Sequence, residues 1–151
     1  MFGKKLSEYF QFERWVLILI AVVFAIRLIL PLVGVSIAQA RWVSINIVLL
    51  AGLIYCSVAV HTARFGGYPQ LFGLLFLQNA LAHILIAIAL ILAIVTGTNN
   101  IYTAPEFFGG NDGRNWLHVL AHTIAAFVVP VFAWLVGSVI LFAAKRLKPV
   151  A

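Results

Sequence analysis

The sequence predicts an all-α integral membrane protein in which four transmembrane helices form a bundle. Of the 151 residues, 64% are hydrophobic and only 9% are charged, and four long apolar runs are separated by polar segments. A soluble domain carries about 25% charged residues. A helix that crosses a bilayer needs about 20 predominantly apolar residues, and each of the four runs reaches that length.

The four spans are expected at residues 15–38, 42–60, 71–96 and 116–144. They must be helical, because unpaired backbone groups are not tolerated in hydrocarbon. Only residues 39–41 separate the first two spans, which are therefore predicted to form an antiparallel hairpin. Residues 97–115 form the one long connection. Residues 1–14 contain apolar and aromatic side chains among basic ones, and a short amphipathic helix at the membrane interface is predicted there. The whole chain, 1–151, is taken as a single membrane domain.

The placement of Lys and Arg predicts the topology. One side carries the termini and the loop after the second span, with Lys4, Lys5, Arg14, Arg64, Lys145, Arg146 and Lys148. The other side carries Arg41 and Arg114. The positive-inside rule then predicts a plasma (inner) membrane protein with both termini in the cytoplasm and the long connection outside. The basic residues form no stripe interleaved with aromatics, so no nucleic-acid partner is expected.

Titratable residues gather in "EFFGGNDGRNWLHVLAHT", residues 106–123, which holds two of the four acidic residues and two of the four histidines. His118 and His122 are four residues apart and share one helix face. One helix uses this spacing to offer two imidazoles to a metal. Glu106 and Asp112 precede them on a glycine-rich loop. We therefore predict these four residues as ligands of zinc, copper or iron.

A structural role accounts for most of the same residues. Asn115 or Asp112 can cap the fourth helix, and Asp112 with Arg114 can be a solvated ion pair. His118 can place its polar tip among lipid headgroups. His122 is harder to explain in this way. It should lie about 10 Å along the helix from Asn115, where an imidazole needs a partner.

Polar residues inside the spans predict a second part of the site. A guanidinium at the bilayer centre costs about 3 kcal/mol on insertion scales, so Arg27 should face the bundle or a partner protein. Asn79 and His83 are one turn apart on the third span. With Asn46 and His122, these residues are predicted to line one polar pocket that opens outward and binds a cofactor. Asn46 and Asn79 have an alternative role in hydrogen bonds between helices.

A b-type haem is a variant of the cofactor prediction. Two of His83, His118 and His122 would be its axial ligands, and Arg27 would hold an anionic group such as a propionate. The expected depths place His83 several ångströms below His122, which favours a metal ion over haem.

Three functions fit these features. The first is an outward-opening histidine and carboxylate site for a metal or haem, used in electron transfer or metal handling. The second is a non-catalytic subunit or assembly factor of a larger membrane complex, and the third is an oligomeric transporter or channel for a small anion. The expected partners are the lipid bilayer and either further copies of the chain or a membrane complex. No catalytic residue is predicted, because no phosphate-binding glycine loop, CxxC pair or GxSxG pattern occurs. Cys56, the only cysteine, is expected to be buried.

Overall fold

Long helices make up most of the chain in a computed structural model that describes residues 1–105 and 112–147. The elements in chain order are α1 (Leu6–Ile29), η1 (Leu30–Val33), α2 (Ile37–Ala40), α3 (Ile45–Thr62), α4 (Tyr68–Thr96) and α5 (Trp116–Leu147). The described residues contain no strand. Among them, four helical stretches are long and apolar enough to cross a membrane, as the composition predicted.

The first helix starts earlier than the apolar run. α1 begins at Leu6, and its backbone leaves helical geometry at Glu13 (φ −108°, ψ 16°) before it continues to Ile29. The predicted interfacial segment is therefore the first part of α1, bent at Glu13. Its side chains do not all face outward: Tyr9 and Glu13 are buried, whereas Phe10 is exposed.

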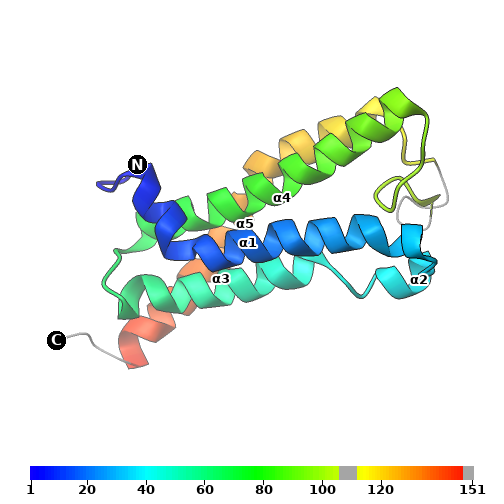
Figure 1. Cartoon of the computed structure of the whole chain (residues 1–151). Coiled ribbons are helices and arrows are strands. Elements are labelled where there is room, and N and C mark those ends of the chain that lie inside the picture. The colour runs from blue at the N-terminus through cyan, green and yellow to red at the C-terminus, as the bar shows by residue number, and fades with distance from the viewer. Residues whose placement is uncertain (106–111, 148–151) are drawn as a thin grey trace.

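A proline and a glycine end the first span. Pro31 lies in the first turn of η1, where its missing N–H costs least. Gly34 follows with φ 86°, a left-handed conformation that glycine adopts without strain. The Ser36 hydroxyl then accepts a hydrogen bond from the backbone N–H of Gln39 and starts α2. This turn reverses the chain, so α1 and α3 run antiparallel (Figure 1), as the sequence predicted.

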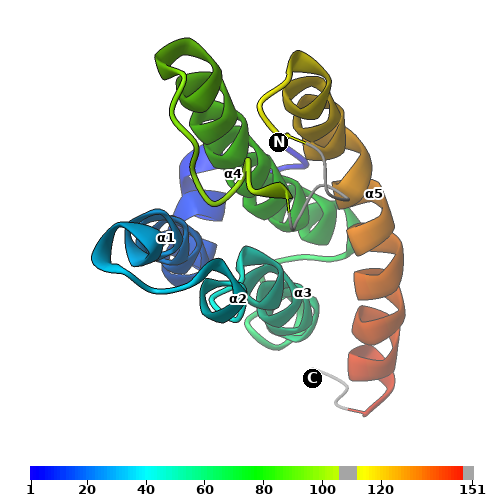
Figure 2. The ribbon, with the colours of Figure 1, turned by 90° about the vertical axis from the view of Figure 1, so that its right-hand side faces the viewer.

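Both ends of the bundle can be recognised in Figure 1. The start of α1, the α3–α4 connection and the end of α5 lie at one end, which we call the terminal end. α2 and residues 97–105 lie at the other, which we call the loop end. α4 and α5 lie side by side near the loop end, and α5 then crosses toward α3 (Figure 2).

The buried residues form two clusters, one toward each end. The cluster at the terminal end contains Tyr9, Leu53, Cys56, Val60, Leu71, Leu74, Leu75 and Leu141. The cluster at the loop end joins residues of α1, α3, α4 and α5 to Ile101 and Tyr102 of the connection. Large apolar side chains also cover the outside of the bundle; Phe127, Phe132 and Val139 are 63%, 63% and 70% exposed. Such a surface is suited to lipid rather than water.

Candidate functional site

The described part of the long connection folds back onto the bundle. Its residues 101–104 are buried. Asn100 holds the turn: its Nδ2 donates to the carbonyl of Ala89 on α4 (2.7 Å), and its Oδ1 accepts from the backbone N–H of Tyr102 (2.9 Å). Residues 100–104 are therefore packed against the loop end of the bundle.

Arg27 contacts Tyr102 in this packed segment. Its guanidinium carbon lies 5.2 Å from the ring centre of Tyr102. The same ring stacks on Phe24, with the ring centres 5.5 Å apart and the planes at 17°. Burial raises the pKa of Tyr102 to about 12, because a buried phenolate is poorly solvated, although the nearby Arg27 acts in the opposite direction. Arg27 thus joins α1 to the loop, and its predicted role toward a cofactor stays a prediction.

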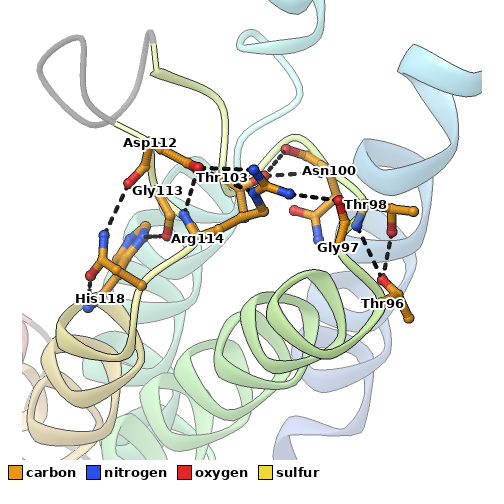
Figure 3. A network of polar contacts seen from close by, with 10 residues as sticks. Thr96, Gly97, Thr98, Asn100, Thr103, Asp112, Gly113, Arg114 and His118 are labelled. Carbon is orange, nitrogen blue, oxygen red and sulfur yellow. Dashed lines mark hydrogen bonds and ion pairs between the residues drawn. The ribbon is translucent and has the colours of Figure 1, made fainter.

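Asp112 and Arg114, near the end of the connection, are joined to Gly97 at its beginning (Figure 3). Arg114 donates from Nε and Nη2 to the Asp112 carboxylate (3.2 and 3.0 Å) and from Nη1 to the carbonyl of Gly97 (2.6 Å). These hydrogen bonds lower the pKa of Asp112. The carboxylate that was predicted as a metal ligand is bound to a guanidinium instead. Glu106, the other predicted carboxylate ligand, lies outside the described residues.

Asn115 caps the start of α5, which confirms the structural role that the sequence predicted for it. Asn115 Oδ1 accepts a hydrogen bond from the backbone N–H of His118 (2.8 Å). The Nδ1 atom of His118 lies 3.0 Å from the carbonyl oxygen of Gly113. Because a carbonyl can only accept, His118 carries its hydrogen on Nδ1 in this contact.

His122 has a partner on the neighbouring helix. Its Nδ1 lies 2.9 Å from Nδ1 of His83 on α4. The ring of His118 lies one turn away, with its centre 5.1 Å from that of His122 and the two planes tilted by 39°. We call these three residues the histidine ladder. The expectation that His122 is bonded, with His83 among its candidate partners, is confirmed.

The predicted depth difference between His83 and His122 is wrong. Two nitrogens 2.9 Å apart lie at the same level of the bundle. The prediction compared positions along two apolar runs, but the register of α4 against α5 depends on how the two helices pack against each other. The run lengths alone do not contain that information.

The polar residues line two cavities and not the one predicted. His83, His122 and Thr123 line a cavity of about 340 Å³ between α4 and α5, with apolar side chains around them. Asn46 and Asn79 line another, of about 320 Å³. The Asn79 side chain donates to the carbonyl of Leu75 in its own helix (2.8 Å). Local bonding therefore takes up one amide group that was expected to join the histidine site.

The complete predicted ligand set is not assembled in the part of the chain that the structure describes. Within residues 1–105 and 112–147, no group of three or more His, Cys, Asp or Glu side chains is arranged to hold a metal ion. A haem between His83 and His122 does not fit this geometry either. The two rings are bonded directly, so a porphyrin has no space between them.

Comparisons with protein-family models, with curated proteins and with solved structures found no match to this chain.

Sequence reasoning missed a polar cluster at the terminal end. Glu13 of α1, Cys56 of α3 and Gln78 of α4 meet there and are buried. The sequence predicts Glu13 on a helix at the membrane surface, where water solvates a carboxylate and no partner is needed. The available signal was Gln78, an amide within an apolar span that also needs a partner.

Proposed function

We propose that the chain is an inner-membrane metal-handling protein that binds a divalent transition ion, such as zinc, copper or iron, between His83 and His122. The observation that carries the proposal is the 2.9 Å separation of their Nδ1 atoms on two different helices. Both termini would face the cytoplasm, and the loop end, with the histidine ladder near it, would face outward.

The separation of the two nitrogens suits a shared ion. A zinc–imidazole bond is about 2.0–2.1 Å long. Two such bonds on one ion place their nitrogens about 2.9 Å apart at a right angle and about 3.4 Å apart at the tetrahedral angle. The pair is therefore spaced for two-point binding with little movement of either helix.

Binding requires a change of tautomer but no new charge. In the present contact one Nδ1 donates and the other accepts. For both nitrogens to bind an ion, the donating ring must move its hydrogen to Nε2, which leaves two neutral imidazoles. His83 and His122 both line the cavity of about 340 Å³ between α4 and α5, which gives their rings space to reorient.

His118 supports a route from the loop end. Its ring centre lies 5.1 Å from that of His122, and its Nδ1 contacts the carbonyl of Gly113 in the connection. With its hydrogen on Nδ1, a neutral His118 has its lone pair on Nε2, and a rotation that brings this atom to the ion would make His118 a third ligand. An ion could thus be received by His118 and His122 and passed to His122 and His83.

Metal handling is favoured over electron transfer. Two protein ligands leave at least two positions of the ion open to water or another ligand. An open site exchanges its ion readily, which suits transfer. A redox centre needs a fixed geometry, and a larger set of ligands would be required to provide it.

Titration of the untagged, purified protein with Zn²⁺ or Cu²⁺, followed by isothermal calorimetry, tests the proposal. We expect about one ion per chain. His83→Ala and His122→Ala should each weaken binding by at least tenfold, since each removes one of two ligands. His118→Ala should weaken it less. His61→Ala, at the other end of the bundle, is the matched control. Equal binding by the wild type and by His83→Ala and His122→Ala would exclude this site.

The two other functions lead to different results. As a subunit of a larger complex, the chain would bind no ion stoichiometrically and would co-purify with a partner in fixed ratio. As an anion transporter, it would support anion flux into liposomes that depends on Arg27 and not on His122.

A further inference from the structure

A buried carboxyl group at the terminal end has only half of its hydrogen bonds. Glu13 is 1% exposed. Its Oε2 accepts a hydrogen bond from Gln78 Nε2 (2.8 Å). Its Oε1 is buried and has no partner among the described residues. No ion pair in the described part of the chain joins Glu13 to a lysine or arginine.

Gln78 also has a buried oxygen without a hydrogen-bond partner. Its Nε2 donates to Glu13 and also lies 3.2 Å from the sulfur of Cys56. Both amide hydrogens are thus used, which fixes the nitrogen on that side of the amide. The Gln78 Oε1 atom is buried and has no donor among the described residues.

The surrounding packing places Gln78 Oε1 beside α1. A Cβ atom added to Gly52 on α3 would collide with Gln78 Oε1 and with Val16 Cγ1. Val16 is one helical turn beyond Glu13. The unpartnered amide oxygen therefore lies where α1, α3 and α4 meet, and the glycine leaves room for it.

One proton held between Glu13 Oε1 and Gln78 Oε1 would satisfy both unpartnered oxygens. An ionised Glu13 would put a carboxylate oxygen and an amide oxygen, both acceptors, into a buried site where neither has a donor, and a buried charge without compensating bonds is strongly unfavourable. In the acid form, Glu13 Oε1–H would donate to Gln78 Oε1, while Gln78 Nε2–H donates to Glu13 Oε2. Carboxylic acids and primary amides form this two-point pair because their donors and acceptors match.

We propose that Glu13 and Gln78 form a proton-binding site in the bundle, with the proton held by Glu13 and shared with the Gln78 amide. Among the described residues, the titratable groups beside Glu13 on the helices packed against it are the Cys56 thiol, from α3, and Tyr55, also of α3, which lines the same groove. Neither supplies a positive charge that would favour the carboxylate. Loss of the proton would turn two acceptors toward each other at the bend of α1 and weaken its contact with α4.

A groove connects this site with the outside of the bundle. Its volume is about 280 Å³, and it is lined by Glu13, Tyr55, Phe12, Trp15, Val16 and Leu19. Its walls are almost entirely apolar, so it would admit an apolar reagent better than a charged one. This property provides a chemical test of the protonation state.

Infrared spectroscopy on the folded wild-type protein at pH 7 is the first measurement. We expect a carbonyl band from a protonated carboxylic acid that disappears in Glu13→Gln. This variant keeps a two-point pair with Gln78, because two amides also match, and should remain folded. Gln78→Leu should keep the acid band but shift it to the frequency of a carbonyl without a hydrogen-bond partner. Glu8→Gln is the control, since Glu8 is exposed and pairs with Lys4 (3.2 Å).

Labelling with N,N′-dicyclohexylcarbodiimide is the second measurement. A carboxylic acid gives its hydrogen to a nitrogen of the reagent and bonds through oxygen to the central carbon, and no group leaves. Peptide mass spectrometry should find the adduct on Glu13, less of it as the pH rises, and none on Glu8. Absence of both the Glu13-dependent acid band and the adduct at pH 7 would show an ionised Glu13 and overturn the proposal.

Discussion

Arg27 and Arg14 make the same kind of contact in different surroundings. The Arg27 guanidinium lies 5.2 Å from the Tyr102 ring and is half-buried, whereas Arg14, 4.9 Å from the Trp15 ring, is exposed. A cation over an aromatic ring contributes about 0.5–1 kcal/mol at an exposed site and about 2 kcal/mol when water is excluded. Burial, and not distance, should therefore decide their contributions.

We predict that Arg27→Ala lowers the free energy of unfolding by about 1–2 kcal/mol and that Arg14→Ala changes it by less than about 1 kcal/mol. Unfolding in mixed detergent, followed by circular dichroism, measures both. Equal effects of the two substitutions would mean that Arg27 does not hold the loop to α1.

The stability that the Arg27–Tyr102 contact provides should depend on pH, because Tyr102 can ionise. Its pKa is raised to about 12 by burial, above the value near 10 of an exposed tyrosine. A group with a raised folded-state pKa contributes its full stability below the unfolded pKa and loses it as pH rises through the folded pKa. The stabilisation should therefore be complete below about pH 10 and disappear toward pH 12.

Ultraviolet difference titration of the wild type against Tyr102→Phe isolates this residue. The difference should show one phenol that ionises only near pH 12, or together with unfolding at that pH. A Tyr102 phenolate that forms near pH 10 would place its ring in solvent and contradict the packed loop.

At the scale of helices, close approach between neighbours depends on single small residues. Gly137 of α5 faces Ser57 of α3 and Leu75 of α4: an added Cβ would lie 2.8 Å from Ser57 Oγ and 3.2 Å from Leu75 Cδ1. The Ser57 hydroxyl donates to the carbonyl of Leu53 (2.7 Å), so it cannot turn away without loss of that bond. This glycine sets the distance at which α5 crosses α3.

Gly137→Ala should therefore lower the midpoint of thermal unfolding and cost about 1–3 kcal/mol, the usual range for overpacking. Gly67→Ala is the matched control, because the nearest atom to its added Cβ, Gln70 Oε1, is 4.0 Å away. Equal midpoints for the two variants would argue against a tight crossing of α5 and α3.

The sequence predicted that the four helices exist, but it did not predict how α4 is aligned lengthwise against α5. Apolar run lengths predicted the four spans, because backbone satisfaction in lipid allows few alternatives. The same runs misplaced His83 relative to His122, since the direct packing of α4 against α5 sets their register, and run lengths do not describe that packing. His122 could be predicted to need a partner, because an imidazole in an apolar helix is costly when unpaired. Which partner it has depends on that register.

At the scale of the whole molecule, the two ends of the bundle differ in the groups they hold. The histidine ladder and the Asp112–Arg114 pair belong to the loop end, and the Glu13–Gln78 pair belongs to the terminal end. The charge-rich stretch of the sequence is thus partly structural. Arg114 uses Asp112 to close the loop, and His118 and Asn115 order the start of α5. The polar cluster of Glu13, Cys56 and Gln78 was not predicted, because its members come from three segments that are far apart in the sequence.

The charge distribution predicts that the loop end faces outward. A reporter enzyme active only outside the cytoplasm should be active when fused at Asn100 and inactive when fused after Leu147. The reverse pattern would invert the topology and place the histidine ladder near the cytoplasmic side.

The central claim is that His83 and His122 bind a transition metal ion, and elemental analysis of protein purified from its membrane without a histidine tag tests it most directly. The proposal predicts close to one zinc, copper or iron per chain in the wild type and in His61→Ala, and almost none in His83→Ala or His122→Ala. A wild-type protein that carries no transition metal, and takes up none after incubation with each ion and removal of the excess, would contradict it.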